Sequence, residues 1–296
     1  MTGSNLAGLP DRGDEKAALA TSSWTNLVTN LQTGNHLVTA SLLNIPTASG
    51  LPLSLQLAHN SMNASIDVGV GKDWMTNLHT CVSEDGQSGD ITYMDPSGAL
   101  YVFTYDSQTQ TYTNPKGFAG KLTKEVSGEY ILQGLNHTKQ VFGTDGKLTT
   151  ISEVCGTNPD TINIAYNGNG NPITATDSLS GRAITLTWDA NQKLSSINDP
   201  MSNTWSFTQN ASNQLTTITQ PEDGSQTPPP TRPTTTFSYD GNNLITGHDD
   251  FLGDSYEIGY EASSPYKITS WIHKFYNKCI IIRCRNTNIS FCFSYC

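Results

Sequence analysis

The chain has 296 residues, of which 35% are hydrophobic and only 14% are charged, and its 25 glycines and 14 prolines favour short strands and turns over helices. Its formal net charge of −10 and the lack of a basic stripe argue against nucleic acid as a partner. No segment approaches the roughly 18 consecutive apolar residues of a membrane span, so we expect no insertion into a membrane.

Residues 1–24 are predicted to be a polar leader without regular structure. Charged residues interrupt it between Asp11 and Lys16, and it has no apolar stretch of the kind that secretory signal peptides carry. We therefore expect either export by a route that does not use this signal or a chain that is part of a longer protein, and we favour the second.

Residues 25–126 are predicted to be an N-terminal β region. Between Leu51 and Leu57 every second residue is leucine, which is the period-2 pattern of a half-buried strand. Further on, Met94–Gly98 is a strong turn signal that separates Ile91–Tyr93 from Ala99–Phe103, and this order predicts a β-hairpin.

Residues 127–271 are predicted to be a repeat array. Between Thr161 and Trp271 one short hairpin is written about five times, at a period of about 21 residues. Each unit alternates large apolar with small or polar residues in its first strand, turns on Asp, Asn or Gly, and returns in a second short strand. The proline-rich loop Gln226–Pro233 lengthens one unit and is predicted to lie outside the strands, because proline cannot donate ladder hydrogen bonds.

These units have to stack to be stable. A single hairpin of this size is marginal in water, so neighbouring units must lie side by side to bury their apolar faces. The residues expected to line the shared inner face are Ile164, Leu186, Phe207, Phe237 and Ile258. Because the array then ends without closing, we also expect an unpaired strand edge near residues 255–271.

The aromatic residue that ends the first strand of several units is interpreted as part of the core. Four such residues share the phase of the inner face, which favours packing over a sugar-stacking surface: Tyr166, Trp188, Tyr239 and Tyr260. We expect Trp188 to be fully buried, so Trp188→Ala should cost about 3–5 kcal/mol. The acidic residues that follow two of them, Asp189 and Asp240, are interpreted as turn formers rather than catalytic groups.

Residues 272–296 form an atypical, basic tail. The tail has no Asp or Glu, and it holds four of the six cysteines: Cys279, Cys284, Cys292 and Cys296. Three interpretations stay open, namely an out-of-frame or read-through tail, the start of a variable C-terminal domain, and a degenerate last repeat. The tail has too few residues to bury an independent core, which argues against an enzyme housed there.

No motif predicts a metal, a cofactor or a catalytic centre. The spacing of the tail cysteines lacks the paired knuckles of zinc sites. The run His248–Asp250 with Asp254 offers oxygen ligands for calcium but lacks the EF-hand spacing, so a solvated turn is favoured. Phosphate-binding, nucleophile-elbow and zinc-protease motifs are absent from the sequence. We therefore expect a chain without metal, cofactor or enzymatic activity.

The repeat unit resembles that of a known family. Its best copy is Trp188-Asp189 followed by Leu194, Ile197 and Asp199-Pro200, and Tyr239-Asp240 with Leu244 is the second. This pattern resembles the YD repeat of Rhs (rearrangement hotspot) proteins. The structural repeat positions that we assign are Tyr166, Trp188, Asp189, Leu194, Ile197, Asp199, Pro200, Phe207, Leu215, Ile218, Tyr239, Asp240, Leu244 and Tyr260.

The segment before the repeats also resembles its counterpart in Rhs proteins, and the resemblance covers about residues 26–271. Gly69–Trp74 is similar to a Gly-x-Gly-Trp element of the family, with two extra residues before the tryptophan. The repeats depart from the family pattern at several places, among them Tyr166-Asn167 and Tyr260-Glu261, where Asn or Glu stands in place of Asp. Gln209-Asn210 replaces a Tyr-Asp pair, and the glycine expected shortly after Asp199-Pro200 is missing.

The resemblance implies an all-β fold of tandem β-hairpin repeats that form a spiralling sheet, part of a hollow shell. In Rhs proteins this shell encloses a C-terminal toxin or effector and is exported or displayed at the cell surface. The implied partners are therefore the rest of a longer shell and its effector, and neither a toxin nor the family's self-cleaving segment is recognisable here. The alternative is a cell-surface module that binds glycans through the same repeats, which exposed aromatic residues at the turn tips would favour.

Overall fold

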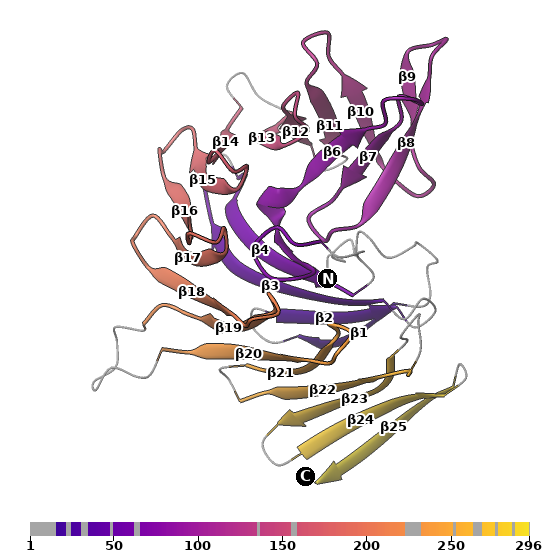
Figure 1. The fold of residues 1–296 in the computed structure, drawn as a ribbon, viewed down its shortest axis with the longest axis vertical. Helices are drawn as coiled ribbons and strands as arrows, with labels where there is room; N and C mark the ends of the chain where they lie inside the picture. The colour runs from indigo at the N-terminus through magenta and orange to yellow at the C-terminus, as the bar shows by residue number, and fades with distance from the viewer. Residues whose placement is uncertain are drawn as a thin grey trace. The chain divides into compact units, whose positions relative to one another are not determined.

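The computed structural model describes residues 16–21, 25–30, 35–47, 50–61, 66–134, 137–154, 159–222, 232–250, 253–262, 268–275, 278–285 and 288–295. These residues form 25 strands and one three-residue 3₁₀ helix, η1 (Asn77–His79), so the predicted all-β fold class is confirmed (Figure 1). The chain divides into two compact units. Unit 1 comprises Met1–Asp11, Ser41–Ala58 and Met75–Thr187, and unit 2 comprises Arg12–Ala40, His59–Trp74 and Trp188–Cys296.

The N-terminal strands form two small sheets, each in the order of the sequence. The first sheet contains β1 (Lys16–Thr21), β2 (Thr25–Asn30), β3 (His36–Ile45), β4 (Leu53–Asn60) and β5 (Trp74–Thr76). The second contains β6 (Cys81–Glu84), β7 (Ile91–Met94), β8 (Leu100–Asp106) and β9 (Thr111–Thr113). The hairpin predicted on either side of Met94–Gly98 is confirmed, because β7 and β8 pair antiparallel from Ile91↔Phe103 to Met94↔Leu100.

The third sheet contains the repeat array together with β10 before it and two strands of the tail, and its strands follow one another in sequence order from β10 to β25. Its strands in unit 1 are β10 (Gly120–Lys124), β11 (Tyr130–Gly134), β12 (Thr138–Phe142), β13 (Leu148–Glu153), β14 (Thr161–Tyr166), β15 (Pro172–Asp177) and β16 (Ala183–Trp188, whose last residue belongs to unit 2). Its strands in unit 2 are β17 (Leu194–Asn198), β18 (Thr204–Gln209), β19 (Leu215–Thr219), β20 (Thr234–Tyr239), β21 (Ile245–Asp249), β22 (Ser255–Tyr260), β23 (Ile268–Phe275), β24 (Lys278–Arg285) and β25 (Asn288–Tyr295).

The alternation in the sequence translates directly into burial. In unit 1, Ile164 and Leu186 are 8% and 2% exposed, and in unit 2 Phe207, Phe237 and Ile258 are 8%, 4% and 4% exposed. On each of these strands, the residues directly before and after the named residue are exposed or half-buried. All five residues expected on the inner face are therefore buried, each within its own unit.

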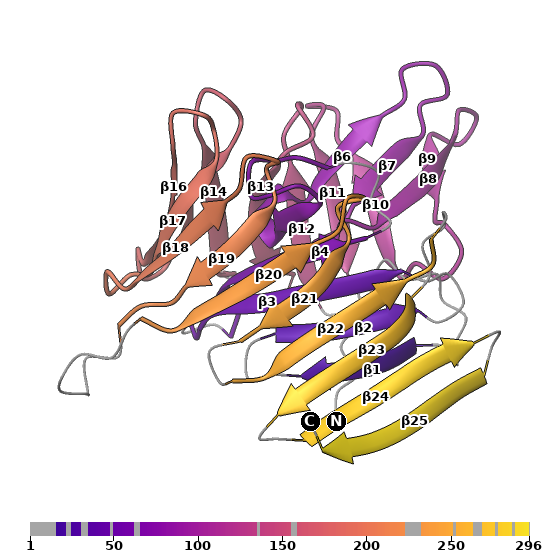
Figure 2. The same ribbon diagram turned by 60° about the horizontal axis from the view of Figure 1, so that its bottom comes forward.

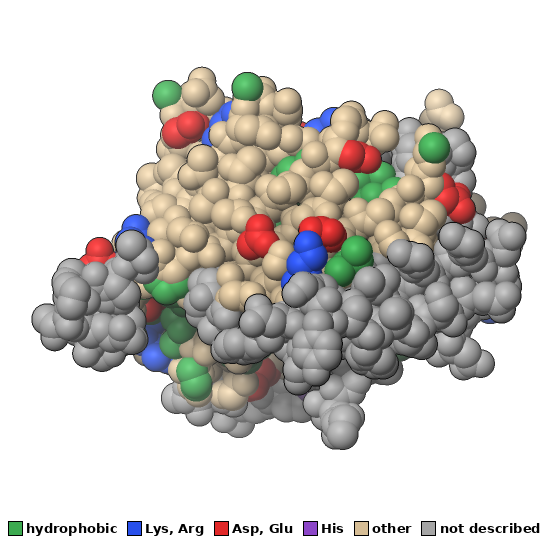
Figure 3. All heavy atoms as spheres, turned by 90° about the horizontal axis from the view of Figure 1, so that it is seen from below, with side chains coloured by type: hydrophobic (Ala, Val, Ile, Leu, Met, Phe, Trp, Pro, Cys, Tyr) green, Lys and Arg blue, Asp and Glu red, His purple; other side chains and the backbone are tan. Residues whose placement is uncertain are grey.

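The outer side chains are mostly uncharged. On the face shown in Figure 3, the described acidic and basic side chains are few and lie, singly or in small groups, among uncharged polar groups, backbone and a few hydrophobic side chains. This distribution reflects the low share of charged residues in the sequence.

The expected strand edge near residues 255–271 is wrong. β22 pairs with β21 on one side and with β23 on the other, and β23 pairs in turn with β24 (Figure 2). The ladder therefore continues through the basic tail, and its last described strand is β25. The sequence analysis missed β24 and β25 because the tail has no Asp or Gly, which mark the turns of most earlier repeats.

Two further expectations need correction. Residues Lys16–Thr21 of the leader form strand β1, which pairs with β2, although the leader was expected to lack regular structure. Trp188 is only half-buried rather than fully buried. The remainder of the leader, Cys155 and residues 223–231 of the proline-rich loop lie outside the described residues.

Candidate functional site

Several turns that separate the strands of the repeat array share one local construction. An Asp or Asn opens each of these turns, and its Oδ1 atom accepts hydrogen bonds from the backbone N–H groups two and four residues later. In unit 2 this holds at Asp189, Asp199, Asn210 and Asp240, with donor–acceptor distances of 2.8–3.0 Å. Each of these side chains therefore replaces ladder bonds that the turning backbone cannot make.

The fourth residue of each such turn has a left-handed backbone. The φ angles are 61° at Gln192, 68° at Ser202, 60° at Asn213 and 68° at Asn243. This conformation costs an L-residue roughly 1–2 kcal/mol and is tolerated best by glycine and asparagine. It allows the hairpin to close with a one-residue bulge, as seen between Thr208 and Gln209 and between Ser238 and Tyr239.

A segment that we call the strap, residues 66–74 of unit 2, crosses three of these turns in succession. The carbonyl oxygen of Gly69 accepts hydrogen bonds from the Leu194 amide (2.8 Å) and from Nε2 of Gln209 (2.7 Å). The Lys72 amide donates to the carbonyl oxygen of Asn213 at 2.7 Å. The strap thereby bonds to residues that lie more than 100 positions later in the sequence.

The third turn, residues 240–244, is bonded to the strap through side chains. Nδ2 of Asn243 donates to Oδ2 of Asp73 at 2.6 Å. Burial raises the pKa of Asp73, and the hydrogen bond from Asn243 opposes that rise because it favours the charged carboxylate. Asn243 is only 5% exposed, so this contact is shielded from water.

Two glycines allow the strap to lie against the turns. A Cβ atom on Gly69 would stand 2.1 Å from the carbonyl oxygen of Gln192, and one on Gly71 would stand 2.8 Å from Cβ of Leu215. Both glycines also have positive φ angles, of 79° and 142°. No other residue fits at either place without displacing backbone.

Trp74 anchors the end of the strap. Its side chain is fully buried, and its Nε1 donates to the hydroxyl of Tyr239 at 2.8 Å. The ring meets Phe237 edge-on at 4.9 Å between centroids and lies 5.3 Å from His59. The Tyr239 hydroxyl passes the bond on to the carbonyl oxygen of Leu215 at 2.6 Å. Trp74 of the strap, Tyr239 of β20 and Leu215 of β19 thus form one connected hydrogen-bond network.

The hydroxyl of the repeat tyrosine has the same function in each unit of the chain. Tyr166 donates to the carbonyl oxygen of Leu148 at 2.7 Å and Tyr260 to that of Ile245 at 2.8 Å, as Tyr239 does to Leu215. Burial raises the pKa of all three phenols, so they remain protonated donors. Each tyrosine therefore bonds to the repeat before its own.

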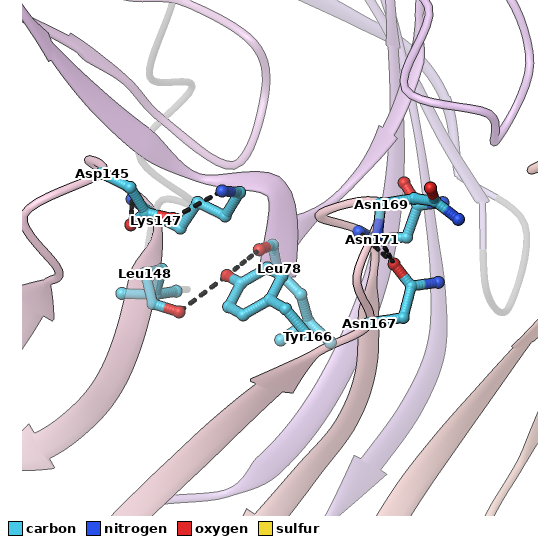
Figure 4. A network of polar contacts seen from close by, with 8 residues as sticks. All are labelled: Leu78, Asp145, Lys147, Leu148, Tyr166, Asn167, Asn169 and Asn171. Atoms are coloured by element: carbon cyan, nitrogen blue, oxygen red, sulfur yellow. Dashed lines mark hydrogen bonds and ion pairs between the residues drawn. The ribbon is translucent and has the colours of Figure 1, made fainter.

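In unit 1 a similar arrangement joins residues 78–82 to the array. The Val82 amide donates to the carbonyl oxygen of Gly146, which has a φ angle of 78°. Tyr166 points its hydroxyl at the carbonyl oxygens of Leu78 and Leu148, with the Asn167 turn beside it (Figure 4). The left-handed turn residue is again the one that meets the N-terminal segment.

Histidines occupy the core of unit 2. His36, His59 and His248 are completely buried, and burial lowers their pKa values to about 3, about 3 and about 4. His248 stands between Phe237 and Tyr256 on adjacent strands, at 5.1 and 5.4 Å between ring centroids. Within the described part of the chain, the ring nitrogens of His59 and His248 have no hydrogen-bond partner. These rings are therefore packed as neutral aromatic groups.

The assigned repeat positions lie mainly in the core or at its border. Six are buried: Leu194, Ile197, Phe207, Leu215, Ile218 and Leu244. Asp199 is 9% exposed, and Pro200, Tyr166, Trp188, Tyr239 and Tyr260 are half-buried. The exposed Asp189 and the half-buried Asp240 open their turns.

The solvated turn expected for the group considered for calcium is wrong in part, because His248 and Asp249 belong to strand β21 and both His248 and Asp250 are buried. Oδ1 of Asp250 accepts a hydrogen bond from the Asp254 amide at 3.0 Å. Among the described residues, no group of three or more His, Cys, Asp or Glu side chains is arranged to hold a metal ion.

Sequence reasoning missed the strap contacts, the tyrosine hydroxyl bonds and the buried histidines. The signal for the strap was present in Gly69-Val70-Gly71 followed by Trp74, since two nearby glycines in a polar segment indicate a close backbone approach. The histidines carried no such signal, because their spacing in the sequence is irregular.

Comparison with known proteins gives a partial match. A family model described as a domain of unknown function, DUF6531, matches residues 29–103. The comparison with curated proteins found no match. No helix in the described residues is long and apolar enough to cross a membrane.

Similar solved structures include two crystal structures that contain TcdB2-TccC3. The TcdB2-TccC3-Cdc42 structure is 10% identical with a TM-score of 0.33, and the similarity covers 90% of this chain and 15% of that chain. The TcdB2-TccC3-TEV structure is 13% identical with a TM-score of 0.28, covering 85% of this chain and 17% of that chain. The chain thus spans less than a fifth of the length of these two proteins.

A third similar structure is a porin-like protein from Bacteroides uniformis ATCC 8492. It is 13% identical with a TM-score of 0.20, covering 72% of this chain and 91% of that chain. Similarity at the level of these three structures assigns no function.

Proposed function

We propose that this chain is a non-enzymatic wall segment of an Rhs-type repeat protein, and that the complete wall encloses or displays a C-terminal toxin or effector. The observation that carries the proposal is the strap of unit 2. It joins three consecutive repeats through Gly69, Lys72 and Asp73, so that hairpins which would be marginal alone become one wall. The partners are then the remainder of a longer shell and its effector.

The repeat chemistry supports a wall rather than a catalyst. The residues common to the repeats are used for turns, core packing and bonds between neighbouring units, as at Asp189, Leu194 and Tyr239. A secreted or cell-surface location follows from the proposed family. It also fits an acidic chain with many uncharged polar side chains.

The glycan-binding alternative depends on aromatic residues that are free to stack on sugars. Tyr166, Tyr239 and Tyr260 are half-buried, and their hydroxyls are bonded to backbone carbonyl oxygens of the preceding repeat. These contacts favour a wall segment over a glycan-binding module. A glycan array with specific hits that survive in a Trp188→Ala variant, where the half-buried ring is removed, would favour a binding role elsewhere on the chain.

The experiment that tests the proposal begins with the DNA on both sides of this reading frame. We expect further repeats and an effector gene segment in continuity with it. The protein expressed from the whole locus should protect its C-terminal effector from protease until denaturant opens the wall. An effector that is cleaved equally fast with and without the repeat region would contradict the proposal.

A further inference from the structure

Three histidines in the core of unit 2 come from both its N-terminal strands and its repeats. His36 begins β3 and His59 lies in β4, whereas His248 lies in β21 of the repeat array. All three are buried, with 0% of their surface exposed. The ring of His59 faces Tyr239 of β20 at 6.3 Å between centroids. The ring of His248 lies 5.1 Å from Phe237 of the same strand. The cluster therefore joins the N-terminal strands of unit 2 to its repeats.

The surroundings of this cluster are unfavourable for a positive charge. Among the described residues, the ring nitrogens of His59 and His248 have no hydrogen-bond partner. Two carboxylates, Asp249 and Asp254, favour protonation of His248. The histidines oppose one another, because a charge on His248 lowers the pKa of His36 and a charge on His36 lowers that of His59. Each added proton would therefore meet both desolvation and repulsion from the other rings.

Two phenol rings also line the cluster, and neither supplies a negative charge to it. Burial raises the pKa of Tyr239 and of Tyr256, so both hydroxyls stay neutral in mild acid. Asp250 and Asp254 lie near Tyr256, but Asp254 is also paired with His273 at 3.4 Å. The charges around the cluster therefore compensate a protonated histidine only in part.

Unit 1 has fewer groups that respond to mild acid. Of its two histidines, His137 is exposed, and Nδ1 of His79 accepts a hydrogen bond from the Thr76 amide at 3.2 Å. Burial lowers the pKa of His79 to about 4. Carboxyl groups with a lowered pKa, such as Glu84 and Asp177, lose their stabilising effect only below about pH 4.5. Between pH 6.5 and pH 5, unit 1 therefore has one such histidine where unit 2 has three.

We propose that mild acid opens unit 2 while unit 1 keeps its fold, and that the cluster of His36, His59 and His248 is the trigger. A solvated imidazole binds a proton near pH 6.5, so acid favours any state in which the cluster is taken apart. The strap is released with the cluster, because His59 packs against Trp74. The switch itself rests on these contacts, whereas its use, the opening of a wall on acidification, rests on the proposed function.

Hydrogen exchange of the full 296-residue chain at pH 7.5 and at pH 5 tests the proposal, after correction for the intrinsic exchange rate at each pH. Each histidine that is buried when unit 2 is closed and solvated when it is open should favour opening about thirtyfold at pH 5. The central amides of β17 and β19 should therefore exchange about 10⁴-fold faster at pH 5, and those of β11 and β12 in unit 1 about thirtyfold faster or less. Neither effector nor further wall is needed, so failure of the switch is distinguishable from failure of the proposed function.

Histidine variants identify the trigger. The double variant His59→Phe with His248→Phe replaces two imidazoles by rings that bind no proton, so its β17 and β19 amides should accelerate only about thirtyfold. The control His137→Asn removes an exposed histidine whose φ angle of 59° suits asparagine, and it should respond like the unaltered chain. Circular dichroism at pH 7.5 establishes that the variants are folded. If the double variant is not folded, the single variant His248→Phe should still lose about thirtyfold of the acceleration.

Three outcomes would overturn the proposal. The first is exchange in unit 2 that does not accelerate at pH 5. The second is equal acceleration in the two units, which would indicate general acid unfolding. The third is a pH response in the folded histidine variants that is as large as in the unaltered chain.

Discussion

The two ends of the hairpins in unit 2 are built from the same turn chemistry but lie in different surroundings. At one end the left-handed residues Gln192, Asn213 and Asn243 each lie against the strap. At the other end Ser202 is exposed, and the left-handed Gly253 has open space where a side chain would begin. Local sequence therefore marks the turns at both ends, and at one end the strap adds bonds between neighbouring hairpins beside the ladder pairs of β17 with β18 and of β19 with β20.

Of the changes considered, a drop in pH should cause the largest loss of stability, and it should act at the strap end because His59 packs against Trp74 and Tyr239. An unfolded histidine binds a proton near pH 6.5, whereas the folded pKa values are about 3 for His36 and His59 and about 4 for His248. Between these values the unfolded state binds more protons, so stability is full above about pH 6.5 and falls as the pH drops. At pH 5 the three histidines together should lower the free energy of unfolding by on the order of 6 kcal/mol.

Urea unfolding at pH 7.5 and at pH 5 measures this loss. The charged groups that face the cluster, Asp249 and Asp254, favour the protonated His248 and so reduce its share. The variant His248→Phe, which places a third apolar ring between Phe237 and Tyr256, should remove roughly a third of the pH dependence. Equal urea midpoints at the two pH values would show that these histidines are not buried as described.

Substitution of Trp74, which anchors the strap, should destabilise the chain more than substitution of Trp188, which lies beside the strap. Trp74→Ala removes a fully buried ring and leaves the Tyr239 hydroxyl without its donor, so it should cost about 3–5 kcal/mol. Trp188→Ala removes a half-buried ring and should cost about half as much. Equal losses in chemical denaturation would contradict the greater burial of Trp74.

Two glycine substitutions test the close contact at the strap end against the open space at the far end. Gly253→Ala should cost about 1 kcal/mol, because only its backbone conformation is unfavourable for alanine. Gly69→Ala has the same backbone cost, and its Cβ would also overlap the Gln192 carbonyl oxygen, so it should cost about 2 kcal/mol more. Thermal unfolding of the two variants side by side gives the difference, and a Gly69→Ala variant as stable as Gly253→Ala would rule out the close contact.

The smallest effects should have opposite signs at the two ends. Ser202→Gly should stabilise the chain by about 1 kcal/mol, because glycine adopts the left-handed conformation without strain and Ser202 is exposed. Asn243→Gly gains the same backbone freedom but loses the hydrogen bond to Asp73 in a buried place, so it should destabilise by about 1 kcal/mol. Stabilisation in both variants would mean that the strap adds nothing at Asn243.

The sequence predicted the hairpins because their cause is local. Alternation placed Ile164 and Phe237 inside, and the Asp or Asn at each turn marked where a strand ends. The strap contacts were not predictable in this way, since Gly69 and Leu194 are distant in sequence and meet only in the folded chain. The burial of His248 depends likewise on neighbouring strands, and β24 and β25 form without the Asp and Gly residues that mark the turns of most other repeats.

Native-state hydrogen exchange at the Lys72 and Leu194 amides tests the function of the strap most directly. Both amides donate across it, to the carbonyl oxygens of Asn213 and Gly69. If the strap holds the repeats together, these two amides should exchange only through global unfolding. They should therefore exchange as slowly as the central amides of β17 and β19. Fast exchange at Lys72 and Leu194, while those strands remain protected, would show that the repeats hold together without the strap.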